Sequence, residues 1–406
     1  MAIGAAGASP VAAQQLASEV LLDRHMTVAA GATVSGTVGA LVAHAEDATV
    51  PHRLFAEEGM SRRTANVTYR FLKFALLDAP QEHLLLVFNH EVFGHGARLR
   101  ERFDGPIEYH VALPEPYGDG TGATSFVFDR EPTPFELLAV HAGGMESTGV
   151  VASTVAERAF VDRRMSPRDA YRYVTFELDT LRYIASTDEN EERGHDVADF
   201  LHSYNALAAA AGAPALTTRH LKREALISLA NPMAAYAAIG IVRYWWNGDT
   251  NVPVPALSIG GMRYLPLFRY RLTPFGTEWA LVNSLGGRIR PTEVELRVGR
   301  APLSTPWGVG VRQRNVATFG GWALDAAVDV WRQPPVDETQ PVRLTLDPHT
   351  GTRVRVRGNH AVLPVWFSSS RATVVVELGA KSGGYVPGEP LRRGVVARAG
   401  VGIPLP

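Results

Sequence analysis

The sequence of 406 residues contains no cysteine. This absence excludes disulfide frameworks, thiolate metal sites, iron–sulfur clusters and cysteine nucleophiles. Lysine is nearly absent as well, and arginine supplies almost all of the 40 basic residues, which balance 41 acidic ones to a net charge of −1. A nucleic-acid-binding protein would show a basic excess, so we expect no nucleic-acid partner. The sequence also lacks a phosphate loop and a Gly-x-Ser-x-Gly motif, and the glycine-rich stretch 31–39, with no lysine after it, is a weak nucleotide signal.

Two residue types change in frequency near residue 250. All seven tryptophans lie from Trp245 onward, whereas eleven of the thirteen histidines lie at or before His220. Together with the length, this shift predicts a first domain over 15–250 and a second over 251–406. Residues 1–14 are small and apolar, and are interpreted as a signal-peptide remnant or a disordered tail.

The first domain shows mostly helical periodicity, with loops or a short hairpin over 103–134. Pro80 predicts a break between the first two helices. The uncharged stretch 225–242 is borderline for a membrane span, but Asn231-Pro232 interrupts it, which favours a buried helix. The predicted helices are 62–79, 81–102, 135–163, 167–187, 195–212 and 217–246.

From about Val254 the apolar residues recur with a period of two. Val294, Leu296 and Val298 alternate with charged residues, and the same pattern recurs in several later segments separated by glycine-containing turns. We count roughly eight to ten strands with no helix between them. The expected fold class is therefore α+β, with a helical N-terminal domain followed by an antiparallel meander closed as a β-barrel, or folded as a sandwich.

Several of these strands have one apolar face and one charged or small face, with aromatic residues near the turns. Transmembrane barrels use this pattern, with lipid-facing apolar residues and aromatic girdles. The stretch 376–406 resembles the final hairpin of bacterial outer-membrane barrels. We therefore expect a protein of the bacterial cell envelope, in the outer membrane, with a soluble barrel as the alternative.

The sharpest local signal is the segment Asn89-His90-Glu91-Val92-Phe93-Gly94-His95-Gly96. Common zinc peptidases place two histidines four residues apart on a helix, with a glutamate beside the first. Here the histidines are five apart, and a regular α-helix would set them ~140° apart around its axis. They converge only if the helix absorbs an extra residue, as a π-bulge does, and Gly94 makes such a distortion cheaper.

These residues resemble the dipeptidyl peptidase III family of zinc peptidases, which carries a His-Glu-x-x-Gly-His motif with the same one-residue insertion. The match covers fewer than ten residues. The resemblance implies that His90 and His95 bind zinc and that Glu91 is the catalytic general base. It also implies a third ligand from a glutamate on a later helix, and Glu146 lies at about that distance. His141 is the alternative ligand.

The expected function is zinc-dependent hydrolysis of a peptide or protein substrate. Candidates for the group that stabilises the developing oxyanion are Tyr109, His110, His195 and His202, and nothing in the sequence selects among them. For His195-Asp196 and His202, a solvated helix is the favoured interpretation. The alternative function is a non-catalytic outer-membrane barrel whose helical domain binds a partner or plugs the pore.

Overall fold

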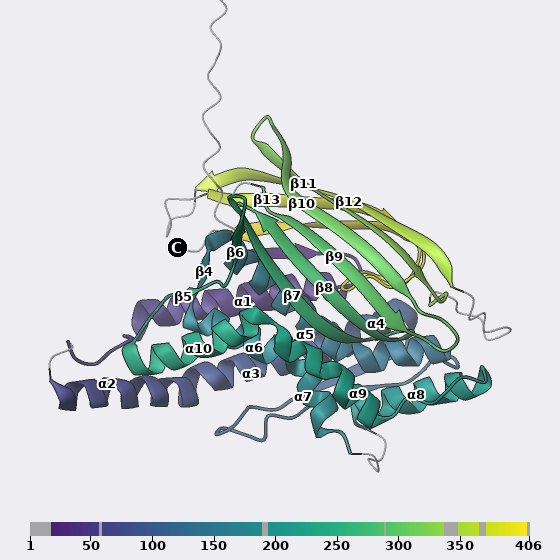
Figure 1. Cartoon of the computed structure of the whole chain (residues 1–406), viewed down its shortest axis with the longest axis horizontal. Helices are drawn as coiled ribbons and strands as arrows, with labels where there is room; N and C mark the ends of the chain where they lie inside the picture. Colours follow the sequence, from purple (N-terminus) through teal and green to yellow (C-terminus); the bar gives the residue numbers. More distant parts are fainter. Residues whose placement is uncertain are drawn as a thin grey trace, which may run out of the picture.

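The protein is a layer of helices covered by one large, curved antiparallel sheet (Figure 1). The computed structural model describes residues 18–56, 59–188, 194–287, 290–336, 348–364 and 371–403. The expected α+β class is confirmed. The predicted tail at 1–14 lies outside the described residues.

The motif lies on a continuous helical run that spans residues 60–102. The run consists of α2 (Met60–Lys73), the π-helical turn η1 (Phe74–Asp78), α3 (Ala79–Phe88), a second π-helical segment η2 (Asn89–His95) and α4 (Gly96–Arg102). The predicted break at Pro80 is wrong. The π-turn directly before the proline has wider hydrogen-bond spacing, which accommodates a residue that has no N–H to donate.

The remaining helices follow the predicted segments closely, and most begin at recognisable caps. Thr133 forms a capping box with Glu136 at the start of the longest one, and Ser166 caps the next. An additional helix that the periodicity did not indicate, α1 (Val28–Thr49), precedes the motif. The others are α5 (Pro134–Asp162), α6 (Pro167–Glu177), α7 (Asp179–Ser186), α8 (Asp196–Ala210), α9 (Thr218–Ala225), the 3₁₀ turn η3 (Leu226–Ala230) and α10 (Pro232–Asn247).

Ten strands form the main sheet, in the order β1-β14-β13-β12-β11-β10-β9-β8-β7-β6, with every neighbouring pair antiparallel. The predicted meander is confirmed. Its strands are β1 (Ser18–Leu22), β6 (Leu257–Ile259), β7 (Met262–Thr273), β8 (Gly276–Gly286), β9 (Thr292–Arg300), β10 (Trp307–Phe319), β11 (Trp322–Gln333), β12 (His349–Pro364), β13 (Arg371–Lys381) and β14 (Gly394–Ile403).

The prediction of a closed barrel is wrong, because the sheet is open. Its two edge strands, β1 and β6, do not pair with each other in the part of the chain that the structure describes. Helices α1 and α5 pack beneath the concave side, against β1 and β7 respectively, and so occupy the space across which the edges would have to meet. The edge strand β1 comes from the N-terminal part of the chain, ahead of all the helices.

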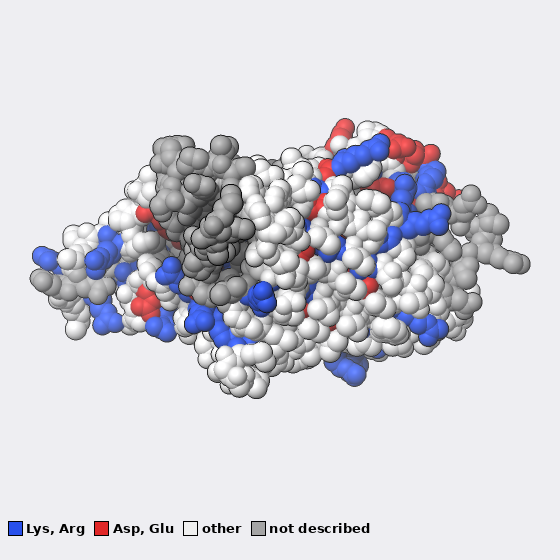
Figure 2. Space-filling model, turned by 90° about the horizontal axis from the view of Figure 1, so that it is seen from above, with Lys and Arg blue, Asp and Glu red and all other residues white. Residues whose placement is uncertain are grey.

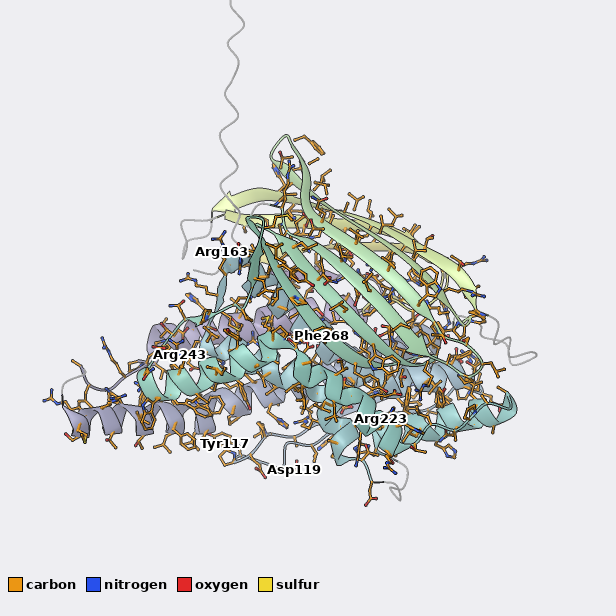
Figure 3. All side chains as sticks on the ribbon, viewed as in Figure 1. Tyr117, Asp119, Arg163, Arg223, Arg243 and Phe268 are labelled. Carbon is orange, nitrogen blue, oxygen red and sulfur yellow. The ribbon has the colours of Figure 1, made fainter. Side chains whose placement is uncertain are left out.

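One hairpin and one short pair of strands from distant parts of the chain complete the fold. Strands β2 (Ile107–Val111) and β3 (Gly122–Phe126) pair in the region predicted as loop or hairpin, and β4 (Arg164–Met165) pairs with β5 (Val252–Pro253). The β2–β3 connection, which carries Tyr117 and Asp119, lies on the side of the helical layer that faces away from the sheet (Figure 3).

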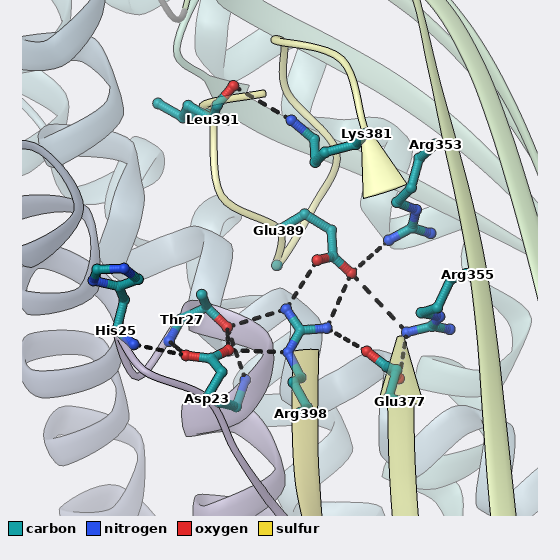
Figure 4. A network of polar contacts seen from close by, with 12 residues as sticks. Asp23, His25, Thr27, Arg353, Arg355, Glu377, Lys381, Glu389, Leu391 and Arg398 are labelled. Atoms are coloured by element: carbon teal, nitrogen blue, oxygen red, sulfur yellow. Dashed lines mark hydrogen bonds and ion pairs between the residues drawn. The ribbon is translucent and has the colours of Figure 1, made fainter. Parts of the chain in front are cut away.

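The concave face of the sheet carries a buried network of charged side chains (Figure 4). Glu389, in the segment between β13 and β14, accepts hydrogen bonds from Arg353 at 2.6 Å and from Arg398 at 2.8 Å. Arg398 also donates to Glu377 and to Asp23, ahead of α1. The same segment reaches the motif helix, because the Glu389 carbonyl accepts from Arg98 of α4 at 3.0 Å. Ion pairs therefore fix the sheet against the helices that carry the motif.

Candidate metal centre

His90 and His95 lie side by side on the π-helical segment η2. Their ring centroids are 4.9 Å apart, and both rings are buried. The wider turn of η2 brings the two histidines to the same side of the helix, as a regular α-helix would not. The predicted convergence of the two imidazoles is confirmed.

The π-turn is held in a close crossing with α5 that only glycines permit. A Cβ atom on Gly94 would lie 2.5 Å from the Cα of Gly144, and a Cβ on Gly144 would lie 2.1 Å from Nε2 of His90. The small residues just before Glu146, Gly143 and Gly144, thus allow α5 to approach the motif helix this closely. Gly94 serves this close approach between two backbones.

Asn89 anchors the start of the π-helical segment η2 between helices α1 and α5. Its side chain accepts a hydrogen bond from Ser35 of α1 at 2.9 Å and donates one to Ser147 of α5 at 2.9 Å. The first residue of η2 is therefore tied on both sides, which sets the positions of the histidines that follow.

Both histidines are oriented through their Nδ1 atoms. Nδ1 of His90 lies 3.3 Å from a carboxylate oxygen of Asp179, and Nδ1 of His95 lies 2.6 Å from the carbonyl oxygen of Val140. Both partners accept hydrogen bonds only, so each Nδ1 carries a proton. Each Nε2 then keeps its lone pair in the neutral imidazole and carries a second proton in the imidazolium. Metal-binding histidines in proteins are oriented in this way.

The two Nε2 atoms converge on a third side chain, Asp196 at the first position of α8. Its Oδ2 atom lies 2.9 Å from Nε2 of His90 and 3.2 Å from Nε2 of His95. Two imidazole Nε2 atoms and a carboxylate oxygen thus meet at one point. Such a cluster is stable only when positive charge lies among its members, either as protons on the imidazoles or as a metal ion.

The electrostatics of the cluster show how strongly it attracts positive charge. Burial alone would lower the pKa of His90, but Tyr183, Asp179 and Asp196 outweigh burial and raise the pKa well above its usual value. The pKa of His95 is also raised against burial, chiefly by Asp196. Burial likewise opposes ionisation of Asp196, yet the two imidazoles hold the pKa of its carboxyl group far below the usual range.

Glu91 lies next to the histidine pair. A carboxylate oxygen of Glu91 and one ring nitrogen from each of His90 and His95 all lie within 4.8 Å of one another, and all three side chains are buried. The hydroxyl of Thr124 on β3 donates to Glu91 at 2.6 Å, so the β2–β3 hairpin fixes this carboxylate. Glu91 is therefore placed beside the point of convergence.

The cluster approaches solvent on the side of Asp196. Its side chain is 22% exposed, whereas His90 and Asp179 are almost completely buried. Tyr183 of α7 stacks on His90 with ring centroids 4.9 Å apart, and His195 lies 5.6 Å from Tyr183. Asp196, Tyr183 and His195 are all partly exposed, so they lie between the buried histidines and solvent.

The structure places Glu146 away from the histidine pair, which corrects the expected third ligand. Its carboxylate accepts three hydrogen bonds from Arg98, at 2.5–2.9 Å, and a fourth from the backbone N–H of Gly388 at 2.8 Å. Arg98 lies on α4, one turn beyond the motif, and both side chains are buried. A buried guanidinium needs a carboxylate partner, and Glu146 fills that role.

Of the other candidates, His141 lies near the cluster on α5 and is partly buried. Burial lowers the pKa of His141, and the nearby imidazoles of His95 and His202 lower it further. The predicted oxyanion donor Tyr109 interacts with Arg100 at 2.6 Å, while His110 and His202 are exposed.

Sequence reasoning missed three residues that contact the histidine pair: Asp179, Tyr183 and Asp196. The solvated-helix interpretation of His195-Asp196 is wrong for Asp196. The one signal that could have found it is its position at the start of a predicted helix, directly after a histidine. Nothing local to the sequence points to Asp179 or Tyr183.

A cavity lies elsewhere, between the concave face of the sheet and helices α1 and α5. Its volume is about 190 Å³, and its lining includes Arg312, Arg353 and Glu157. None of the described residues of the histidine cluster lines it. The candidate metal centre is thus separate from this charged cavity.

Comparison of the chain with protein-family models, with curated proteins and with solved structures found no match. The function of the histidine cluster is therefore argued from its geometry.

Proposed function

We propose that the protein is a zinc-dependent hydrolase that acts on peptide bonds, with His90, His95 and Asp196 as metal ligands and Glu91 as general base. The observation that carries this proposal is the meeting of two oriented Nε2 atoms and one carboxylate oxygen at a single buried point. Asp196 takes the ligand role that the sequence assigned to Glu146.

The donor set fits zinc. Catalytic zinc sites use three protein ligands, commonly two histidines and a carboxylate, and leave a fourth position for water or substrate. The chain has no cysteine, and the softer thiolate-binding metals are thereby disfavoured. The partial exposure of Asp196 supports access to a fourth position from solvent.

When bound, zinc supplies Lewis acidity, which polarises a carbonyl group and lowers the pKa of water. The chain supplies the proton transfer. Glu91 would take a proton from the attacking water as it adds to the carbonyl carbon, and would return that proton to the leaving amine as the C–N bond breaks. The Thr124 hydroxyl, which donates to one Glu91 oxygen, leaves the other oxygen available for this step.

Asp179 and Tyr183, which contact the ring of His90, would keep this ligand in place during the reaction. Asp179 also accepts a hydrogen bond from Thr148 of α5 at 3.0 Å, so its carboxylate is fixed before it orients His90. The stacking of Tyr183 on His90 restricts the ring from the other direction. A site held this rigidly is typical of catalytic centres.

The variant Glu91→Gln tests the catalytic proposal. It should bind zinc as the wild type does and lose hydrolysis of a mixture of internally quenched fluorescent peptides, because the amide cannot accept the proton. Glu108→Gln, on the exposed β2 strand, is the matched control and should retain activity. Full activity in Glu91→Gln, or no zinc in the wild type, would overturn the proposal.

One observation favours a non-catalytic alternative, in which the helical part supports the sheet and binds a partner. Helices α1 and α5 lie beneath the concave face of the open sheet, against β1 and β7 respectively. Under this alternative the wild type hydrolyses none of the peptides even when zinc is bound, and Glu91→Gln changes nothing.

A further inference from the structure

In a water-soluble protein, the face of a sheet that packs on the core is apolar and the face toward solvent is polar. In this sheet the arrangement is reversed. On the concave face one register row runs Glu295, Gly310, Asp329, Arg353 and Lys381 across five strands, and its charged members are buried. Charged side chains are thus turned inward, where burial is costly unless they are paired.

The adjacent row on the convex face is apolar. It runs Val294, Val311, Val328 and Val354 across β9, β10, β11 and β12, and the last three are exposed. Seen from above, this part of the surface is largely free of charged residues (Figure 2), and short apolar side chains project from it (Figure 3). A continuous exposed apolar patch of this kind marks a surface that another apolar phase covers.

The apolar surface continues past both edges of the sheet. On α1, Val38 and Val42 are exposed, and on α10, Ile239 and Val242 are exposed. By length and composition, α1 is long and apolar enough to cross a membrane, although half of its most apolar stretch is buried in the protein. The bent pair formed by α9 with η3 and by α10 meets the same criterion when the two parts are taken together.

Helix α1 supplies hydrogen-bond partners to part of the outer edge of strand β1. Thr33 of α1 accepts a hydrogen bond from the Leu21 N–H at 2.9 Å, and Thr37, one turn later, donates to the Glu19 carbonyl at 2.7 Å. An open sheet edge is excluded from hydrocarbon unless its backbone groups are satisfied within the protein. Here the hydroxyl groups of Thr33 and Thr37, one helical turn apart on α1, provide hydrogen-bond partners for part of this edge.

The strands have the length that a bilayer requires. β7 to β14 each span at least nine residues, and a tilted transmembrane strand needs about 9–11. β10 begins at Trp307 and ends at Phe319, both exposed, so aromatic side chains lie at both ends of its apolar span. This placement matches the aromatic girdles at membrane interfaces.

We propose that the convex face of β7–β14, together with the exposed faces of α1 and α10 at its two edges, contacts the acyl chains of a lipid bilayer. The helices take the place that further strands take in a closed barrel. This proposal is independent of the metal centre, which lies within the helical layer.

The absence of cysteine allows a direct test with single-cysteine variants of the full chain. Val311→Cys, Val356→Cys and Ile239→Cys would each be labelled with a small fluorophore and reconstituted into phosphatidylcholine vesicles. Quenching by a nitroxide attached to the lipid chains is compared with quenching by iodide in the water. The matched control is Val127→Cys, because Val127 is 65% exposed but lies outside the apolar surface, beyond β3.

Fluorophores at the three test positions should be quenched several-fold more by the lipid nitroxide than by iodide, and the fluorophore at position 127 should show the reverse. Iodide quenching at all four positions, or failure of the protein to associate with the vesicles, would overturn the proposal. Protection of the labels from both quenchers, together with disulfides between copies when the unlabelled variants at position 311 or 356 are treated with an added thiol oxidant, would instead identify a second copy of this chain as the occupant of the face and would equally overturn it.

Discussion

The variant Gly144→Ala tests the candidate metal centre without altering any ligand. A Cβ at position 144 would lie 2.1, 2.2 and 2.5 Å from three atoms of the His90 ring. Non-bonded carbon atoms rest about 3.5–4.0 Å apart, so the ring must retreat by more than about 1 Å. Tyr183 stacks on that ring and Asp179 holds its Nδ1 atom, which leaves it little freedom to do so.

This displacement is large compared with what a metal site tolerates. Ligand distances in such sites hold within about 0.2 Å, so the variant should lose the contribution of His90. If the roughly 10–16 kcal/mol of a four-ligand zinc site is shared equally, one ligand contributes about 3 kcal/mol, or about a hundredfold in affinity. Zinc affinity measured by competition with a chromophoric chelator should fall by about this factor.

The same helix provides a matched control. A Cβ at Gly149 of α5 would meet no atom within 4 Å. Gly149→Ala should keep the wild-type zinc affinity and gain about 0.5–1 kcal/mol of stability from helix propensity. If Gly144→Ala bound zinc as tightly as Gly149→Ala does, the proposed role of His90 would be refuted.

Further predictions concern the ligands, their supports and the pH. Asp179→Asn should weaken zinc binding by about 10–100-fold, measured with the same chelator, while the protein stays folded. Asp196→Asn should lower zinc affinity by about a hundredfold. Glu146→Gln should leave zinc affinity unchanged but lower the free energy of unfolding in urea by about 3–5 kcal/mol, because Arg98 stays buried without this carboxylate partner. The opposite pattern would restore Glu146 as the ligand. In the metal-free protein the pKa values of His90 and His95 are raised, so their protonation stabilises the folded state. This stabilisation is fully present below the pKa of an unfolded histidine, about 6.5, and is lost as the pH rises through the pKa values of the folded state. Thermal unfolding should therefore show the metal-free protein losing stability from pH 6 to pH 9, and a rise over that interval would contradict the proposed imidazolium–carboxylate cluster.

Much of the fold and about half of the candidate site could be predicted from the sequence. The period-two alternation of Val294, Leu296 and Val298 predicted the strand, because alternation is a local property of an extended chain. The spacing of His90 and His95 predicted the π-turn for a similar reason, since helix geometry relates residues five apart without reference to the rest of the protein.

The errors arise where distant segments meet. Asp196 lies more than a hundred residues from the motif, and only the packing of α8 on α5 brings it to the histidines. Glu146 was assigned by its distance along the chain, but Arg98, on the motif helix itself, takes that carboxylate in a buried ion pair. Whether the sheet closes into a barrel likewise depends on α1 and α5, which pack beneath it. The periodicity of the strands does not reveal what packs against the concave side.

The central claim is that one cation binds at the meeting point of His90, His95 and Asp196. Anomalous diffraction at the zinc edge, from crystals of the full chain grown with zinc, tests it most directly. We predict a single strong peak about 2.0–2.2 Å from Nε2 of both histidines and from an Asp196 oxygen, with Glu91 beyond bonding distance. No peak at this point, or a peak beside Glu146, would contradict the account.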